Sequence, residues 1–289
     1  MSVVNAALYR TFMLRFQLGL FDPIDSQPYW AVPLTAVNTS VSQDNNRLAT
    51  YSSMVLLKND GGLLPLAPGK RVAVIGPHGQ AQSALVGNYL GQLCPDDSFD
   101  CIVTPLQAIT GANVGGTTQY SAGCQITSND TSGFAAAVAL AQSSDYVVLM
   151  MGIDESVEGE AHDRTSIDLP YVQHQLAAAI VATGKPVVLV LLNGGMLDIS
   201  AEKATVGAMV EAGYPGFWGS FAIADTLFGG NDHLGGKLSY TVYPASYVNE
   251  VRALLASACS RMLARALLAS ACSRRPLALC LPSCARRRS

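Results

Sequence analysis

The sequence predicts an α/β fold, a three-layer sandwich in which helices cover both faces of a mainly parallel sheet. The expected strands at 145–151 and 186–192 contain the continuous apolar runs VVLMM (147–151) and VVLVLL (187–192), which are typical of strands buried on both faces. Such runs alternate along the chain with helical segments of about ten residues, the order expected of parallel strands joined by helices. With 49% hydrophobic and 13% charged residues, the 289-residue chain can also fill a sizeable core.

The first 52 residues are predicted to lie outside the sheet domain. Within residues 1–22, four apolar side chains have the spacing of one face of a partly buried helix: Leu8, Phe12, Phe16 and Leu18. Residues 23–52 begin with a linker that contains three prolines. Ser42 is then expected to cap an entry helix that has Leu48 and Tyr51 on its inner face.

Residues 53–245 are predicted to form the sandwich domain. Its expected strands are 71–76, 145–151, 186–192, 206–210 and 237–242, and its expected helices are 133–143, 170–182 and 219–228. Gly184-Lys185-Pro186 separates a helix from the next strand, because proline cannot continue a helix. The stretch 77–132 is mostly irregular, which indicates a functional loop or strands without a clear pattern.

Residues 246–289 are predicted to be a basic, low-complexity tail unrelated to the domain. The segment RALLASACSR occurs at 252–261 and again at 265–274, and no acidic residue follows Glu250. Arginines spaced among leucines and alanines are compatible with a basic amphipathic helix. We favour an out-of-frame translation joined near Val251, because two short copies do not make a repeat protein.

The charge of the chain argues against some classes of partner. Residues 1–251 contain all 21 acidic residues and only 10 of the 18 basic ones, a formal charge of −11. Because binding to nucleic acid needs a basic surface, nucleic acid is not expected as a partner. No apolar run reaches the length of about 18 residues that a membrane helix needs, so no membrane partner is expected either. The N-terminus also lacks the pattern of a signal peptide.

The sequence predicts no metal and no cofactor. The cysteines show no CxxC spacing, and His162 and His174 are too few for a metal cluster. Residues 75–80 follow a strand but lack the GxGxxG spacing of a dinucleotide site. Cys94 and Cys101 flank an acidic segment, and they either close a small disulfide loop or remain free thiols.

A cluster of carboxylates follows the expected strand at 145–151. Its members are Asp154, Glu155, Glu158, Glu160 and Asp163. The carboxyl end of a strand is the edge at which open α/β sheets bind ligands. Because neighbouring carboxylates repel one another, at least one of them should have a raised pKa and act as a general acid. On composition alone, a solvated acidic loop is an equally good interpretation.

Other polar and aromatic residues are expected near the same edge. Asn193 precedes two glycines that either permit close backbone approach or form a tight turn only. Asp163 and Arg164 are expected to pair with each other and so fix the acidic loop. Tyr214 and Trp218 are candidates for a flat face under a sugar ring, although most aromatic residues of this kind belong to a core or an interface.

The acidic loop resembles the acid/base loop of family 3 glycoside hydrolases, in which Val-Glu-Gly-x-x-x-Asp-Arg follows a buried strand. The pattern runs here from Val157 to Arg164. The resemblance implies that Glu158 is the catalytic acid/base, and Glu160 is its rival because a shift of two residues keeps a similar environment. Four further segments resemble the family in order: MVLLKNDGGLLPL at 54–66, RVAVIGP at 71–77, EAGYPGFWGSFAIADTLFG at 211–229 and GGKLSYTVYP, similar to the family's closing strand, at 235–244.

The resemblance implies the C-terminal domain of a secreted, retaining β-glycosidase. The segments GNYLGQLC and YSAGC are most similar to the β-xylosidase and α-arabinofuranosidase branch, and β-glucosidases belong to the same family. The implied substrates are terminal β-linked sugars of xylan or hemicellulose oligosaccharides. The family's nucleophile is an aspartate in a Ser-Asp-Trp context on a preceding barrel domain. This sequence contains no Ser-Asp-Trp, so the resemblance provides no nucleophile in this chain.

The chain is therefore interpreted as a fragment that begins near the barrel's last helix, within residues 1–22, and that is inactive by itself. Its implied partners are the barrel domain and an oligosaccharide substrate. One alternative is a non-catalytic domain that binds carbohydrate or docks on the barrel. A flavodoxin-like nucleotide-binding domain is a further alternative, but the missing phosphate loop argues against it.

Overall fold

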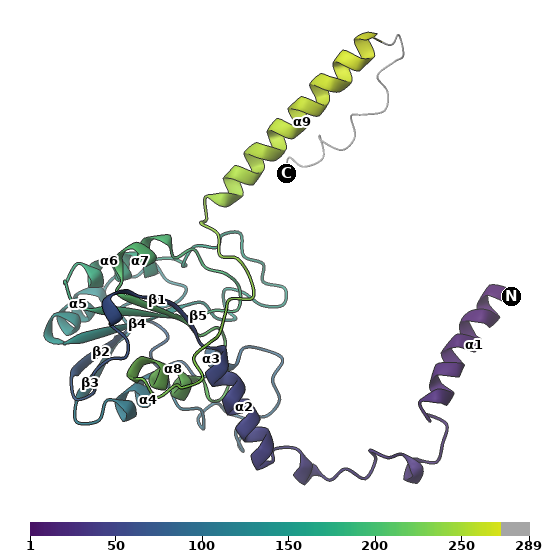
Figure 1. Cartoon of the computed structure of the whole chain (residues 1–289), viewed down its shortest axis with the longest axis horizontal. Helices are drawn as coiled ribbons and strands as arrows, with labels where there is room; N and C mark the ends of the chain where they lie inside the picture. Colours follow the sequence, from purple (N-terminus) through teal and green to yellow (C-terminus); the bar gives the residue numbers. More distant parts are fainter. Residues whose placement is uncertain (273–289) are drawn as a thin grey trace. The chain divides into compact units, whose positions relative to one another are not determined.

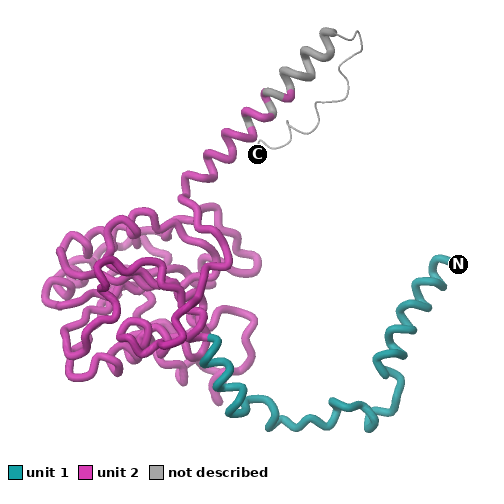
Figure 2. The backbone as a smooth tube through the Cα atoms, in the orientation of Figure 1, with its two compact units in different colours: residues 1–49 teal, residues 50–289 magenta. Residues whose placement is uncertain are grey.

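The structure of the chain is a computed structural model that describes residues 1–272. Backbone contacts divide the chain after Ala49 into two units (Figure 2). The first unit contains α1 (Ser2–Gln17), two short 3-10 turns (Ile24–Ser26 and Leu34–Ala36) and the beginning of α2 (Ser40–Ser53). The second unit contains the sheet and the helices that pack on it.

The helix expected within residues 1–22 is present, but its expected burial is wrong. No residue of α1 is buried, and Leu8, Phe12, Phe16 and Leu18 are exposed. Phe21 folds back on Phe16, with ring centroids 4.5 Å apart. The ring contacts of Phe21 with Phe16 and Phe12 cannot cover the face of a helix of 16 residues, so its apolar side chains remain in solvent.

The entry helix α2 begins two residues before the expected Ser42. The side chain of Thr39 provides an N-terminal cap, since its Oγ1 accepts a hydrogen bond from the Ser42 amide at 3.2 Å. Tyr51 is buried as predicted, and its hydroxyl donates to Asp225 Oδ2 at 2.6 Å. Leu48 is exposed, so only the last turn of α2 has an inner face.

The second unit is built on a six-stranded sheet with the order β1-β6-β5-β4-β2-β3. Its strands are β1 (Val55–Asn59), β2 (Arg71–Ile75), β3 (Thr117–Ser121), β4 (Tyr146–Gly152), β5 (Val187–Leu192) and β6 (Ala208–Glu211). The edge strand β1 pairs with β6 in antiparallel orientation, and every other pairing is parallel. The expected mainly parallel sheet is therefore confirmed.

Helices cover both faces of this sheet (Figure 1). On one face, α4 (Pro105–Ala112) and α8 (Gly219–Phe228) share a core with Val148 and Met150 of β4. On the other face, α5 (Phe134–Ser143) and α6 (Gln173–Val181) share a second core with Val147, Leu149 and Met151. Successive side chains of β4 thus enter opposite cores, which explains the unbroken apolar run and confirms the three-layer sandwich.

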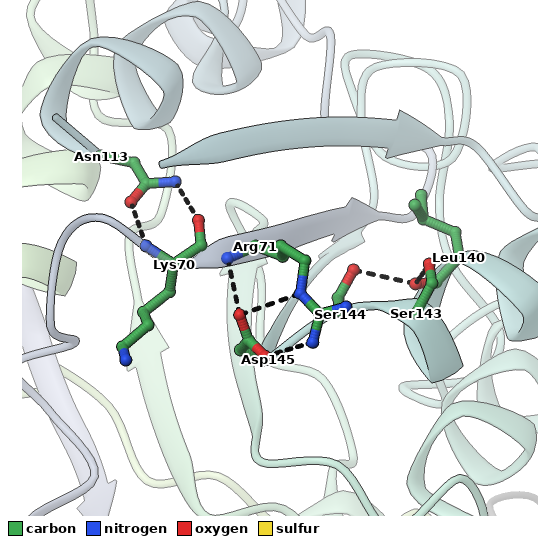
Figure 3. Close-up of polar contacts among 7 residues, drawn as sticks. All are labelled: Lys70, Arg71, Asn113, Leu140, Ser143, Ser144 and Asp145. Atoms are coloured by element: carbon green, nitrogen blue, oxygen red, sulfur yellow. Dashed lines mark hydrogen bonds and ion pairs between the residues drawn. The ribbon is translucent and has the colours of Figure 1, made fainter. Parts of the chain in front are cut away.

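The amino ends of the central strands are held by polar contacts (Figure 3). Arg71 pairs with Asp145 across β2 and β4, with Nη2 and Oδ1 2.6 Å apart, and its backbone amide donates to the same carboxylate at 2.9 Å. The hydrogen bond from the Arg71 side chain holds the pKa of Asp145 well below its usual range. Asn113 Nδ2 donates to the Lys70 carbonyl at 2.9 Å beside this pair. These contacts fix the strands at the edge opposite to the candidate site.

The irregular stretch 77–132 contains elements that the sequence did not reveal. They are α3 (Ser83–Val86), α4 and β3. A disulfide joins Cys94 to Cys101. Of the two alternatives that the sequence left open, the structure therefore contains the disulfide-closed loop and not two free thiols. Cys124 is a buried free thiol, and its burial raises its pKa to about 11.

The strand expected at 237–242 is wrong, because no strand forms there. The edge position beside β6 is already taken by β1. Leu238 and Val242 instead line a hollow together with Leu57 and Met209. The alternating apolar side chains therefore cover the sheet without joining it by backbone hydrogen bonds.

Residues 247–272 of the expected tail form one long helix, α9 (Tyr247–Cys272), whose Leu254 and Leu255 are exposed. The rest of the tail, residues 273–289, lies outside the described residues. Within the described part of the chain, no helix is both long and apolar enough to cross a membrane.

Candidate active site

The candidate site lies at the carboxyl edge of the sheet, where three loops meet. The loops follow β4 (residues 153–172), β5 (193–199) and β6 (212–218). Neighbouring parallel strands bring these loops together. Gly152 ends β4, and the buried side chain of Gln173 bonds to both its amide (3.0 Å) and its carbonyl (2.8 Å). This brace fixes the point at which the acidic loop leaves the sheet.

Glu158 occupies the centre of this arrangement. Its Oε1 accepts hydrogen bonds from the backbone amides of Gly194 at 2.7 Å and Gly195 at 2.9 Å. The hydroxyl of Tyr214 donates to the same oxygen at 3.0 Å. The Arg164 guanidinium lies 3.2 Å from Oε2. With 17% of its side chain exposed, Glu158 is held by groups from all three loops and still reaches solvent.

Arg164 does not pair with Asp163, as was expected. It pairs with Glu158, and its Nη1 also donates to the Met196 carbonyl at 3.1 Å. Asp163 is exposed and makes no ion pair within the described chain. The loop is therefore fixed by an attraction between Arg164 and the candidate acid/base, while the carboxylate of Asp163 faces solvent.

The sequence left two interpretations of the turn at 193–195: a tight turn only, or a backbone that lets other groups approach closely. The structure shows the close approach. A Cβ atom on Gly194 would lie 2.7 Å from Glu158 Oε1, and one on Gly195 would lie 2.3 Å from an Arg164 nitrogen. Any side chain at these positions would thus displace Glu158 or Arg164. Asn193 is buried, and its Nδ2 donates to the Gly195 carbonyl at 3.0 Å, which closes the turn.

Glu160, the rival of Glu158, has a different environment. It is exposed and accepts a hydrogen bond from the hydroxyl of Tyr89, which also lies on the surface. Glu160 makes no contact with the glycine turn or with Arg164 among the described interactions, and it does not line the cleft around Glu158. The geometry thus separates the two candidates, since only Glu158 lines the cleft and contacts the glycine turn and Arg164.

The cleft around Glu158 has a volume of about 520 Å³ and is open to solvent. Its lining residues are Asn88, Glu155, Glu158, Gly159, His162, Asp163, Arg164, Ile167, Gly194, Gly195 and Tyr214. Two effects raise the pKa of the Tyr214 hydroxyl: burial, which is the larger, and the negative charge of Glu158. The hydroxyl therefore remains a donor. Trp218 instead packs against Phe217 and Phe221 and does not line the cleft.

Beneath this cleft lies an acidic residue that the sequence analysis missed. Glu211 ends β6, is 7% exposed, and accepts a hydrogen bond from the Gly213 amide at 3.1 Å. Burial raises the pKa of its carboxyl to about 7. One signal pointed to it, since Glu211 is an isolated acid within the apolar segment AMVEAG. No group of three potential metal ligands occurs among the described residues.

We expect Gly152→Ala to lower the free energy of unfolding by about 3 kcal/mol. Gly152 has a φ of +140°, and an added Cβ would lie 1.9 Å from the Leu192 carbonyl oxygen, a backbone atom that cannot rotate away. Gly111→Ala is the matched control, because Gly111 is in α4 and an added Cβ meets nothing within 4 Å. Urea denaturation compares the two variants, and equal stability would contradict this account of the β4–β5 contact.

The fold and the cleft define an α/β sandwich domain with a solvent-accessible carboxylate at the carboxyl edge of its sheet. Residues 54–260 match the Glycosyl hydrolase family 3 C-terminal domain. The chain therefore belongs to glycoside hydrolase family 3 and corresponds to that C-terminal domain. The match extends past residue 245, where the sequence analysis ended the domain, into the first turns of α9.

Similar proteins include a probable exo-1,4-β-xylosidase of Aspergillus flavus, 38% identical over 252 residues, and β-D-xylosidase 1 of Arabidopsis thaliana, 37% identical over 254 residues. Each match covers 86% of this chain but only 31% of the relative. A solved family 3 exo-β-xylosidase, in complex with a xylobiose aziridine probe, is 35% identical with a TM-score of 0.72, over 81% of this chain and 30% of its own. A β-glucosidase of Listeria innocua has a TM-score of 0.65 and 28% identity, over 76% of this chain and 30% of its own. The chain thus spans about a third of the length of these glycoside hydrolases.

Proposed function

We propose that this chain supplies the acid/base carboxylate, Glu158, to a retaining β-glycosidase of the β-xylosidase type. The observation that carries the proposal is the placement of Glu158, which three loops hold in an open cleft. The relatives named as exo-β-xylosidases support xylose-terminated oligosaccharides of xylan or hemicellulose as the substrate class. Residues 53–245 are the proposed sandwich domain, preceded by a barrel-exit segment (1–22) and a linker with its entry helix (23–52).

The contacts of Glu158 suit the two roles that a retaining mechanism gives to one carboxyl group. In the first step, the protonated group donates to the oxygen of the departing sugar. The carboxylate left behind is then stabilised by the amides of Gly194 and Gly195 and by Arg164. In the second step, the same carboxylate accepts a proton from the attacking water. Tyr214 and the turn closed by Asn193 keep it oriented through both steps.

The nucleophile is proposed to come from a barrel domain that faces this cleft. The carboxylates that line the cleft, Glu155, Glu158 and Asp163, all lie on the loop after β4. A retaining enzyme needs its second carboxylate on the opposite side of the sugar ring. A loop that covers one side of the sugar therefore requires a partner surface to complete the site.

The proposed location is extracellular or within the secretory pathway. The support is the disulfide between Cys94 and Cys101, whose sulfur atoms are 2.05 Å apart. Disulfides persist in oxidising compartments and are rare in the cytosol.

A chimera tests the proposed function. The barrel of a family 3 β-xylosidase is joined to the complete 289-residue chain in place of its own C-terminal domain. We expect the chimera to hydrolyse aryl β-xylosides, while the barrel alone does not, because only the chimera contains both carboxylates. A folded chimera that binds xylose without turnover would contradict the proposal and favour a carbohydrate-binding or barrel-docking domain.

A further inference from the structure

The connections of the parallel strands change direction at β2. The chain after β2 goes to α4, which packs in the same core as α8. The chains after its two neighbours go to the opposite face, from β3 to α5 and from β4 to α6 (Figure 1). Loops that leave neighbouring strands toward opposite faces separate, and open α/β sheets bind ligands in the crevice between such loops. The topology therefore predicts a ligand site at the carboxyl end of β2.

A hollow of about 720 Å³ lies at this place. His78 lines it from the loop after β2, Gln125 from the loop after β3, and Asp154 from the loop after β4. Phe99 adds a further wall from the disulfide-closed loop. We call this space the switch-point hollow. It shares no lining residue with the Glu158 cleft, so the two are separate candidate sites on the same edge of the sheet.

The buried ring of His78 provides an unused polar atom in the wall of the switch-point hollow. His78 is 1% exposed, and its Nε2 has no hydrogen-bond partner within the described part of the chain. Burial lowers the pKa of His78 to about 4, so the ring is neutral at ordinary pH. A nitrogen of a neutral ring either donates or accepts, and a hydroxyl group suits it in both tautomers. The atom therefore favours a ligand that carries hydroxyl groups.

The charges around the switch-point hollow disfavour anions. Asp100 and Asp154 are acidic, and none of the described residues that line the hollow is a lysine or an arginine. A phosphate or a nucleotide would therefore meet negative charge without a cation to offset it. The described residues also contain no group of three potential metal ligands. A neutral ligand fits these surroundings best.

Several polar groups of the switch-point hollow are available to such a ligand. Asp154 Oδ1 accepts the Ser156 amide at 2.9 Å, whereas Oδ2 accepts no hydrogen bond among the described interactions. Gln125 is exposed, and its side-chain amide likewise has no partner among them. The Tyr120 hydroxyl donates to the Gly76 carbonyl at 3.2 Å and keeps its own oxygen as an acceptor. Donors and acceptors thus surround the hollow together, as a ligand with several hydroxyl groups requires.

We propose that the switch-point hollow binds a neutral sugar, with Asp154 and Gln125 contacting its hydroxyl groups and one hydroxyl reaching His78 Nε2. The volume of the hollow lies within the range of small-molecule sites, roughly 300–1,000 Å³. The proposal does not rest on the proposed function of Glu158, because binding here needs neither catalysis nor a barrel domain.

The first test is an NMR titration of the full chain with xylose, arabinose, glucose and xylobiose. We expect at least one of these sugars to bind with a Kd on the order of 1 mM. Binding should shift the backbone amides of Gly79 and Gln125 more than those of Gly194 and Gly195, which border the other cleft. Inorganic phosphate and calcium chloride are titrated in parallel. Shifts of Gly79 and Gln125 with either salt but with none of the sugars would overturn the proposal, as would the absence of any shift there.

Two neighbouring carboxylates provide a matched pair of variants. Asp154→Asn removes a charge from the switch-point hollow but keeps the Oδ1 that accepts the Ser156 amide, so the local turn is preserved. We expect it to weaken sugar binding about tenfold, the effect of losing one charge-assisted hydrogen bond. Glu155→Gln neutralises the next residue, which lines the Glu158 cleft instead, and should leave this Kd unchanged.

Gln125→Ala is a second variant, on an exposed loop, and should weaken binding severalfold. Sugar binding that falls in Glu155→Gln and not in Asp154→Asn would place the ligand in the Glu158 cleft and contradict the proposal. Binding that both Asp154→Asn and Gln125→Ala leave unchanged would also contradict it. Turnover by the barrel chimera is a separate measurement, so a failure of the proposed function and a failure of this site are distinguishable.

Discussion

Glu158→Ala is expected to slow the hydrolysis of β-xylosides with poor leaving groups by about 10²- to 10⁴-fold in the barrel chimera. A poor leaving group departs only if its oxygen is protonated, and Glu158 is the carboxyl group that the three loops hold in the open cleft. Xylosides with good leaving groups should be affected much less in the step that forms the glycosyl-enzyme, because an acidic phenol leaves without a proton. The measurement is kcat/KM across aryl xylosides of graded phenol pKa.

Glu160→Ala is the matched control for this experiment. Glu160 lies two residues away in the same loop, carries the same charge and is more exposed, with Tyr89 as its hydrogen-bond partner. Its removal should leave the dependence on leaving group as it is in the unmodified chimera. If Glu160→Ala steepens that dependence and Glu158→Ala does not, the assignment of the acid/base to Glu158 is wrong.

The predictability of each element depended on how much of it is buried. The strands β4 and β5 and the helix α8 were predicted within two residues, because their apolar side chains enter a core and leave a clear pattern. The strand β3 was missed, since its sequence TTQYS is polar and partly exposed at the edge of the sheet. The segment 237–242 has the alternation of a strand, but β1 occupies the position beside β6 and the segment forms no strand.

The candidate site shows the same limit at the level of side chains. The Val-Glu-Gly-x-x-x-Asp-Arg motif predicted Glu158. The turn at Asn193 was predicted because open α/β sheets bind ligands at the carboxyl ends of their strands. The partner of Arg164 was predicted as its sequence neighbour, whereas the structure pairs it with Glu158. Glu158 is held by amides 36 and 37 residues further along the chain, and such contacts follow from the order of the strands. The burial of Glu211 likewise depends on packing that only the fold establishes.

The 289-residue chain by itself is expected to show no turnover of aryl β-xylosides or β-glucosides. Its cleft has carboxylates on one loop only, and within the described residues no carboxylate from another element lines that cleft. Retaining hydrolysis needs two carboxyl groups about 5–5.5 Å apart, on opposite sides of the bond that breaks. Glu155 and Asp163 share the loop of Glu158 and cannot enclose a sugar ring from the other side.

The open cleft adds a second physical reason for this expectation. A charge that develops in a transition state is stabilised most strongly by fixed dipoles in a site from which water is excluded. Here the cleft of about 520 Å³ is open to solvent. Water therefore weakens the electrostatic interactions of Arg164 and Glu158 with a charge that develops on a bound sugar. The purified chain and its Glu158→Ala variant are assayed side by side with an aryl β-xyloside. Turnover that disappears in the variant would require a second carboxylate that faces Glu158, and would show that the site is complete without a barrel domain.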